Sequence, residues 1–366
     1  MSEPTIENHL KRQRKAAGLS QNALAGLVGV SRQAILAIEA GRNVPSTSLG
    51  LKLAYALGCT VEDIFRLAPD RGLHARLAPS SGGGTGPRVA LGKVDGRWVA
   101  HRLPAHGMTA ADGIVMSEGE GSTAVVRPLG DTAHLERNAL VAGCAPLLGT
   151  VGHRVDRRFS DARVTWLQAG NRQAMDLLAA GLVHVAGLHL SGDADDLAAA
   201  ARRALPGRRV MVANLTRWKQ GLVVPPGNPL GIRTGADLLR PDLRVVRREE
   251  GSGAHDLAVR FLGAEGACHP DGGPAASSHR EVARMVRSGS ADVGIAIEGA
   301  ALAEGLDFVP LSEERFDLVV AQDTASRTPV SRLIETLDDP GFRAEVEHLP
   351  GYDVSASGEV TTVEAA

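Results

Sequence analysis

The residue types that suit the binding of a small anion follow apolar segments in the second half of this 366-residue sequence. Cys144 follows the apolar run 140–143, and the triplet Gly251-Ser252-Gly253 lies between a predicted strand and a predicted helix. Backbone N–H groups at such loops and at helix N-termini hold an anion without needing a lysine. The spacing therefore predicts a ligand-binding cleft built from several loops.

Residues in and beside these loops are the candidate ligand contacts. Ser252, between two glycines at a helix start, is expected to donate to the ligand, with an ordinary helix N-cap as the alternative. His189 is expected either to donate to the ligand or to line one lobe, and Trp218 either covers the cleft mouth or packs at a hinge. The full set is Gly143, Cys144, Asn171, His189, Trp218, Gly251, Ser252 and Gly253.

The sequence contains none of the short motifs that mark common catalytic or metal sites. A Gly-x-Ser-x-Gly elbow, a phosphate-binding Gly-x-x-x-x-Gly-Lys loop and a His-Glu-x-x-His pair are all absent, so we expect no enzyme. Cys59, Cys144 and Cys268 are far apart in the sequence, and no Cys-x-x-Cys pair occurs. We therefore expect neither a disulfide framework nor a bound metal, and no cofactor.

Length and composition set the outline of the molecule. A chain of 366 residues is too long for one core of typical size, so two or three domains are expected. Residues 1–68 carry eight Lys and Arg against five Asp and Glu, although the whole chain has a net charge of -2. This excess places any polyanion-binding surface at the N-terminal end. The polar start and the lack of a long apolar run predict a cytoplasmic protein with no membrane partner.

Residues 1–68 show apolar residues at helical spacing in short blocks, which predicts a bundle of about five short helices. Ser20 suits the N-cap of one helix, Gly29 suits its left-handed end, and Ser31 suits the N-cap of the next. Two short helices joined by a tight glycine turn form a helix-turn-helix, beneath which Ile35 is expected to pack. The N-terminal region is therefore predicted to be an all-α DNA-binding domain.

The segments that carry a family resemblance in this region are 18–21, 24–25, 29–33, 38–42, Pro45 and 53–58. At this spacing they resemble the XRE (lambda Cro-like) family of DNA-binding domains. The resemblance implies base contacts from the second helix, phosphate contacts beside it, and a homodimer on a paired double-stranded DNA operator. A protein-binding module is the alternative, and Glu39 is expected to bond within the bundle. The predicted DNA contacts are Gln21, Ser31, Arg32, Gln33, Arg42 and Asn43.

A flexible linker is predicted over 69–87, because 79–87 is rich in Pro, Gly and Ser and contains no apolar residue to fold around. Residues 88–137 are predicted to form a small β region with a hairpin at Asp95-Gly96, the favoured type of two-residue turn. Another strand is expected at 123–127. A β unit this short is expected to pack on a neighbour or on a dimer mate.

Residues 138–366 alternate predicted strands with predicted helices, which is the pattern of parallel α/β sheets. Helices are expected after Pro146, over 171–180 and from Ala254, and the segment 221–231 is expected to cross between two lobes. Ligands of such folds bind beyond the carboxyl ends of the strands. Strands are expected at 139–141, 163–167, 183–188, 210–212, 222–224, 243–246, 293–297, 308–311 and 318–320.

The segments that carry a second resemblance are 141–146, 181–190, 220–231, 250–254, His279 with 282–283, and 305–311. They resemble the periplasmic solute-binding fold in the molybdate-binding-like form that is fused to DNA-binding regulators. The resemblance implies a multidomain regulator with a helix-turn-helix bundle, a small β region and a two-lobed α/β domain that senses molybdate or tungstate. Two alternatives stay open, namely a larger ligand such as a molybdenum-cofactor precursor, and an oxyanion store.

Overall fold

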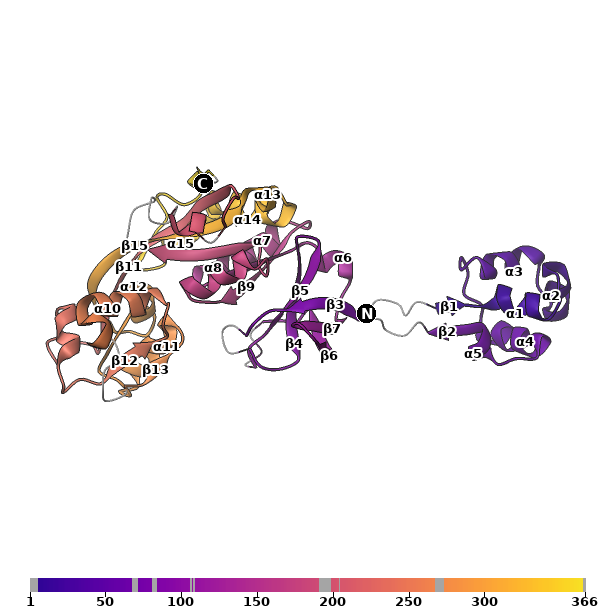
Figure 1. Cartoon of the computed structure of the whole chain (residues 1–366), viewed down its shortest axis with the longest axis horizontal. Coiled ribbons are helices and arrows are strands. Elements are labelled where there is room, and N and C mark those ends of the chain that lie inside the picture. Colours follow the sequence, from indigo (N-terminus) through magenta and orange to yellow (C-terminus); the bar gives the residue numbers. More distant parts are fainter. Residues whose placement is uncertain are drawn as a thin grey trace. The chain divides into compact units, whose positions relative to one another are not determined.

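The computed structural model of the chain describes residues 6–67, 72–80, 84–105, 107, 109–190, 199–203, 205–266 and 273–364. The chain divides into two compact units, Met1–Gly72 and Leu73–Ala366, which are described separately below (Figure 1). The boundary predicted between 68 and 69 lies outside the described residues.

The first unit is a bundle of short helices closed by a pair of short antiparallel strands. Its core is formed by side chains such as Leu24, Ile35 and Leu53, all fully buried. The predicted helical bundle is therefore confirmed. Its elements are β1 (Ile6–Asn8), α1 (Leu10–Ala16), α2 (Gln21–Val28), α3 (Arg32–Glu39), α4 (Thr47–Leu57), α5 (Val61–Ile64) and β2 (Phe65–Leu67).

The turn between α2 and α3 has the predicted caps. Ser20 accepts the Ala23 N–H at the start of α2, and Ser31 accepts the Ala34 N–H at the start of α3. Gly29 ends α2 with a φ of 73°, a conformation that costs glycine little and other residues more. Local sequence therefore specifies the ends of the two helices in the helix-turn-helix.

The second unit begins with a closed five-stranded barrel in the strand order β3-β5-β4-β6-β7. The predicted hairpin at Asp95-Gly96 is confirmed, since both residues have positive φ, 46° and 77°, as a type I′ turn requires. The strand predicted at 123–127 is also present, as β7. The barrel strands are β3 (Leu73–Leu77), β4 (Arg88–Val94), β5 (Arg97–Arg102), β6 (Gly113–Gly119) and β7 (Thr123–Pro128).

Strand β3 lies within the segment predicted as linker, so that prediction is wrong for residues 73–77. Leu73, Ala75 and Leu77 turn inward while His74 and Arg76 are exposed, an alternation that builds one face of a strand. β3 pairs with both β5 and β7, and this closure leaves the barrel without a free edge. The small β region therefore starts at residue 73 rather than 88.

The rest of the second unit is a two-lobed α/β domain built on a ten-stranded sheet, preceded by the short helix α6 (Thr132–Leu135). In the first lobe, Ala139 and Val141 pack with α7 while Leu140 and Ala142 pack with α8, so helices cover both faces. First-lobe elements, with the C-terminal helices, are β8 (Asn138–Gly143), α7 (Leu147–Arg158), β9 (Arg163–Gln168), α8 (Asn171–Ala179), β10 (Val185–Leu190), α13 (Gln322–Ala325), α14 (Thr328–Leu337) and α15 (Pro340–Val346).

The second lobe repeats this plan on a smaller scale. Strand β12 pairs in parallel with both β13 and β14, and α10 and α11 contact this group. The second-lobe elements are η1 (Gly235–Leu239), β12 (Val245–Arg248), α10 (Gly253–Gly266), β13 (Ala275–Ala276), α11 (His279–Arg287), β14 (Val293–Ile297) and α12 (Glu298–Ala303).

Two long antiparallel strands, β11 (Val210–Val224) and β15 (Asp307–Ala321), run through both lobes (Figure 1). Each joins two strands that the sequence analysis expected to be separate, so those separations are wrong. The crossing therefore begins before the predicted segment 221–231. The polar stretch between the predicted strands pairs across the ladder, and Asn214 donates to Asp317 at 2.6 Å. The short strands β16 (Tyr352–Asp353) and β17 (Val360–Val363) also pair with β11.

The barrel packs against the first lobe, as expected for a β unit of this size. His101 on β5 lies 2.7 Å from the Leu182 carbonyl, and the Asn138 side chain donates to the Leu91 carbonyl at 2.7 Å. Apolar residues from β4 and β5 share one core with β8 and α8. The barrel is therefore held to the lobe by both apolar and polar contacts.

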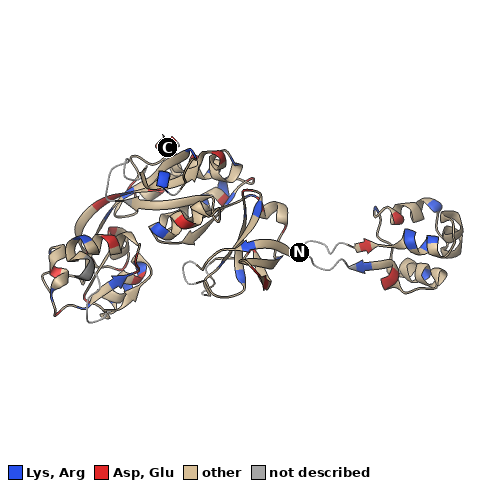
Figure 2. Cartoon of the chain, viewed as in Figure 1, with Lys and Arg blue, Asp and Glu red and all other residues tan. Residues whose placement is uncertain are grey.

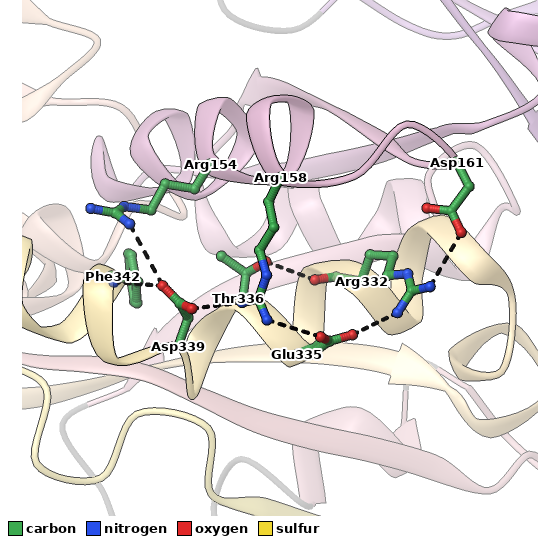
Figure 3. A network of polar contacts seen from close by, with 8 residues as sticks. All are labelled: Arg154, Arg158, Asp161, Arg332, Glu335, Thr336, Asp339 and Phe342. Carbon is green, nitrogen blue, oxygen red and sulfur yellow. Dashed lines mark hydrogen bonds and ion pairs between the residues drawn. The ribbon is translucent and has the colours of Figure 1, made fainter.

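A network of ion pairs fastens the C-terminal helices to α7 (Figure 3). Arg158 pairs with Asp339 at 2.6 Å and with Glu335 at 3.2 Å, while Arg332 joins Glu335 to Asp161. The Arg158 side chain is 43% exposed. The network positions these helices but contributes little to stability, because water screens each pair.

Candidate functional site

The start of helix α3 presents polar side chains that are predicted to contact DNA. Ser31, Arg32 and Gln33 are exposed, and the Ser31 hydroxyl caps the first turn through the Ala34 N–H at 3.1 Å. Ile35 on the opposite face is fully buried. An exposed, capped helix start suits the major groove, where Arg pairs with guanine and Gln with adenine.

Gln21 differs from the other predicted DNA contacts because its side chain has a partner within the bundle. Its amide donates to Glu39 at 2.9 Å, and Arg14 donates to the same carboxylate at 2.6 and 3.2 Å. Burial would raise the pKa of Glu39, but these hydrogen bonds hold it below its ordinary value. Glu39 therefore bonds within the bundle, as expected. Arg42 and Asn43 are exposed, and basic residues also occur on α1 and α3 (Figure 2).

Three chemically active side chains meet between the two lobes of the α/β domain. Cys144 follows β8 and His189 lies on β10 in the first lobe, whereas His279 is the first residue of α11 in the second. One donor atom from each residue lies within 4.8 Å of the other two. Both histidines are buried, and Cys144 is a half-buried free thiol. We refer to these three residues as the Cys-His-His cluster.

Glu314 on the crossing strand β15 orients one imidazole of this cluster. Its carboxylate lies 2.5 Å from His189 Nδ1 and accepts the Trp218 indole N–H at 3.3 Å. All three side chains are almost fully buried. Because Glu314 fixes a proton on Nδ1, Nε2 of His189 is left for another partner. Trp218 packs at the crossing strands, so the hinge-packing alternative describes it and the cleft-mouth alternative is wrong.

The two histidines of the cluster have opposite electrostatic surroundings. Burial would lower the pKa of His189, but the Cys144 sulfur and the Glu314 carboxylate raise it to about 10. Burial lowers the pKa of His279 well below its ordinary value, and the Arg248 guanidinium and His189 lower it further. The cluster therefore pairs a charge-stabilised imidazole with one that stays neutral.

Arg248 lies against the second histidine and at the wall of a small cavity. Its Nη1 is 3.4 Å from His279 Nδ1, while its Nε and Nη2 each lie 2.9 Å from the Glu249 carboxylate. Among the described residues, buried His279 Nε2 has no hydrogen-bond partner. Cys144, Arg248 and His279 line a cavity of about 150 Å³. His279 therefore brings a ring nitrogen without a hydrogen-bond partner to the residues that line this cavity.

Glycines at the cluster allow close packing, both between the lobes and within the first lobe. A Cβ at Gly253, the first residue of α10, would lie 2.7 Å from His189 Nδ1 and closer still to Cε1. A Cβ at Gly143 would lie 3.2 Å from the Cα of Gly187 in the neighbouring strand. Gly251 has a φ of 80°, which other residues rarely adopt. The predicted glycines therefore supply space and backbone shape.

The two polar side chains predicted to donate to the ligand have other bonds in this structure. Asn171 brackets the backbone of His189, donating to its carbonyl at 2.6 Å and accepting its N–H at 3.2 Å. The Ser252 hydroxyl accepts the His255 N–H at 3.2 Å and donates to the Glu249 carbonyl at 2.8 Å. Ser252 is therefore an N-cap, which was the stated alternative, and Asn171 positions a cluster residue.

The structure gathers the predicted ligand residues into one region and adds three that sequence reasoning missed as site residues. His279 stands at a capped helix start after Ser278, and Arg248 ends a strand just before the glycine triplet. Glu314 was missed because its segment was not expected to be a strand. The pairing of Glu314 with Trp218 can be recognised only when β11 and β15 are aligned side by side.

Comparison with family models agrees with this architecture. Residues 10–64 match a helix-turn-helix model, and residues 152–338 match the model of the PBP superfamily domain. The second match spans more than half of the chain. The chain belongs to the PBP superfamily. We therefore refer to the two-lobed region as the PBP domain. Among the described residues, no helix is both long and apolar enough to cross a membrane.

Individual relatives match either end of the chain. The helix-turn-helix unit is 47% identical over 60 residues to the HTH-type transcriptional regulator MJ0272 of Methanocaldococcus jannaschii, covering 16% of this chain and 91% of that protein. The uncharacterised Bacillus subtilis protein YvgK is 35% identical over 162 residues, which are 43% of this chain and 52% of YvgK. This chain thus spans about half the length of that relative.

A solved structure with a similar outline is a candidate phosphate-transporter substrate-binding protein from Clostridium perfringens, determined with bound phosphate. It has 12% sequence identity and a TM-score of 0.49, and the alignment covers 59% of this chain and 99% of that one.

Proposed function

We propose that this chain is a transcription regulator whose PBP domain binds a small ligand and thereby changes DNA binding by the helix-turn-helix unit. The observation that carries the proposal is the Cys-His-His cluster, to which both lobes contribute buried side chains around a cavity. A ligand that bridges the lobes favours the closed arrangement, because it gains contacts that the open arrangement lacks. The same chain exposes Ser31, Arg32 and Gln33 on a helix suited to the major groove.

The DNA half of the proposal implies a homodimer. One helix-turn-helix reads a half-site, so two copies are needed to read a paired operator, and lobe closure would change the spacing of their α3 helices. Because its proposed target is DNA, we expect the protein to act in the cytoplasm. The exposed residues at the start of α3 favour a regulator over an oxyanion store, since a store does not require them.

The size of the cavity bears on the ligand. Pockets for drug-sized molecules measure roughly 300–1,000 Å³, whereas this one measures about 150 Å³. This cavity therefore suits a small ion, whereas a molybdenum-cofactor precursor would need the adjoining pockets of about 670 and 570 Å³, which share Glu249 with it. Molybdate or tungstate stays a proposal, supported by the N-terminus of α10 and by Arg248 at the cavity wall. Against an anion stands the buried carboxylate of Glu314, which contacts His189 of the cluster.

Calorimetric titration of the full chain with molybdate, tungstate, sulfate and phosphate tests the oxyanion. Molybdate or tungstate should bind more tightly than sulfate or phosphate and should raise the melting temperature by mass action. Absence of binding by all four anions would exclude the oxyanion and leave other small ligands open.

DNA binding is tested by titrating the native promoter with wild type and with the double variant Arg32→Ala/Gln33→Ala. Each lost base contact should cost about 1–3 kcal/mol, whereas ligand binding should not change. Arg66→Ala is the matched control, because Arg66 is also an exposed arginine of this unit but lies outside α3. Equal promoter affinity of wild type and double variant would refute the assignment of α3.

A further inference from the structure

We propose that the Cys-His-His cluster binds a divalent transition-metal ion of the zinc class, with Cys144, His189 and His279 as its protein ligands. The proposal rests on the proposed function, since it names the chemical class of the ligand at that same cleft. The sequence alone predicts no metal, because its three cysteines are far apart and no Cys-x-x-Cys pair occurs.

The donor set has the composition of a zinc or similar site. One sulfur and two imidazole nitrogens suit borderline metals such as Zn²⁺ and Co²⁺, whereas Mg²⁺ and Ca²⁺ prefer oxygen ligands. Three protein ligands leave a fourth position, and the adjoining cavity lined by Cys144 and His279 supplies room for water or another small ligand there. A site with an open position is typical of metals that exchange ligands.

The outer contacts of the cluster also fit a metal. A metal-ligating histidine usually donates its second ring N–H to a carboxylate, which fixes the ring and its tautomer. Glu314 stands in that position, 2.5 Å from His189 Nδ1. Nε2 is then the nitrogen that binds a metal, and it gives up its proton when the metal binds. His279 Nε2 is buried without a hydrogen-bond partner among the described residues, a costly arrangement that a bound metal would relieve.

The charges balance when a metal is bound. A divalent ion holds cysteine as the thiolate, so Cys144 and Glu314 together offset its two positive charges. Arg248 is the cation nearest His279, but Glu249 pairs with it through two contacts of 2.9 Å. If His279 binds the metal through Nε2, its proton lies on Nδ1. That proton faces the N–H group of Arg248 across the present 3.4 Å contact, and the two repel each other. Metal binding therefore requires the Arg248 guanidinium to move away from His279.

A thiol catalyst is the competing interpretation, because Cys144, His189 and Glu314 form a nucleophile, a base and an orienting acid. Such a triad does not require a second buried imidazole close to the Cys144 sulfur and the His189 ring. His279 occupies that place and comes from the opposite lobe. The second imidazole therefore favours a metal.

The positions of the three ligands explain how a metal would act as a signal. Two donors in a tetrahedral zinc site lie roughly 3.3–3.5 Å apart, whereas the donor atoms here lie within 4.8 Å of one another. A donor pair near that limit would therefore close by about 1 Å on binding. Because His279 belongs to the second lobe and the other two ligands to the first, metal binding draws the lobes together.

The test is a titration of the chelator-treated full chain with Zn²⁺ and with Co²⁺, followed by calorimetry and absorption spectroscopy. Wild type should bind one equivalent at the cluster, and Co²⁺ should give a thiolate-to-cobalt charge-transfer band. Cys144→Ser and His279→Gln should each lower the affinity at least tenfold, and Cys144→Ser should also remove the band. Cys59→Ser, which changes the half-buried cysteine of the other unit, should alter neither.

Thermal unfolding without metal shows whether each variant is folded, and His279→Gln provides a second measurement should Cys144→Ser fail that check. Equal Zn²⁺ affinity in wild type and in a folded His279→Gln variant would overturn the proposal, as would a wild type that binds neither metal.

Promoter titration with and without Zn²⁺ separates this proposal from the proposed function. Promoter affinity that responds to an oxyanion but not to the metal would support the regulator and overturn the metal ligand. Metal binding at the cluster with no effect on promoter affinity would support the site and refute the regulatory role.

Discussion

Lowering the pH should weaken the packing of the barrel on the PBP domain, because two buried histidines hold that interface in their neutral form. His101 Nε2 contacts the Leu182 carbonyl at 2.7 Å. His184 Nδ1 accepts the Leu140 N–H at 3.0 Å, and its Nε2 lies 3.2 Å from the Lys93 carbonyl. Burial lowers the pKa of each ring from 6.5 to about 4. A proton on His184 Nδ1 would also break its bond with Leu140.

The sign of the effect follows from the direction of these pKa shifts. Between pH 6.5 and about 4, His101 and His184 are protonated in the unfolded chain but remain neutral in the folded chain. The free energy of unfolding therefore falls as the pH falls. The stability is fully present above pH 6.5. One pKa unit corresponds to about 1.4 kcal/mol. A pKa lowered from 6.5 to about 4 therefore means that each histidine reduces the free energy of unfolding by about 3 kcal/mol when the pH falls below 4.

The measurement is urea unfolding followed by tryptophan fluorescence at several pH values between 7.5 and 4. Trp98, Trp166 and Trp218 are the tryptophans of the chain, and all lie in the second unit, so the signal reports on that unit alone. His279, whose pKa is also lowered, acts in the same direction. His189 acts oppositely, since its raised pKa means that stability is lost only as the pH rises from 6.5 towards about 10.

Variants assign the effect to the two interface histidines. The free energy of unfolding should fall less between pH 6.5 and pH 4 in His101→Gln and in His184→Gln than in wild type, by about 3 kcal/mol for each variant. This holds even where the substitution lowers stability at pH 7.5. His153→Gln, an exposed control on α7, should leave the slope unchanged. A double variant whose stability fell with pH as steeply as that of wild type would refute the assignment.

Three further predictions concern other parts of the molecule. Gly253→Ala should weaken ligand binding in the cleft more than tenfold, because its Cβ meets a cluster histidine, whereas Gly149→Ala, with its nearest contact at 3.4 Å, should bind as wild type in calorimetry. Glu39→Ala should lower the stability of the first unit by about 3 kcal/mol by leaving Arg14 buried without its partner; circular dichroism in urea should show an early loss of helix while the fluorescence transition stays in place. Arg158→Ala should cost less than about 1 kcal/mol in the same fluorescence assay, since the Arg158 side chain is 43% exposed, and a larger loss would contradict the view that water screens its ion pairs.

The sequence by itself determined the local structure. Ser20, Gly29 and Ser31 specify the ends of two helices through side-chain caps and a positive φ, interactions that span only a few residues. Asp95-Gly96 specifies a hairpin in the same way. The alternation of strands and helices after residue 138 also predicts an α/β fold, because each element shows its own apolar period.

Only the tertiary structure decided the long strands and the chemistry between the lobes. The polar stretch around Asn214 becomes strand because its partner Asp317 lies about a hundred positions away, and no local pattern contains that pairing. Cys144, His189 and His279 likewise share no motif. They meet because parallel strands end at one edge of a sheet and because β11 and β15 bring the second lobe against that edge.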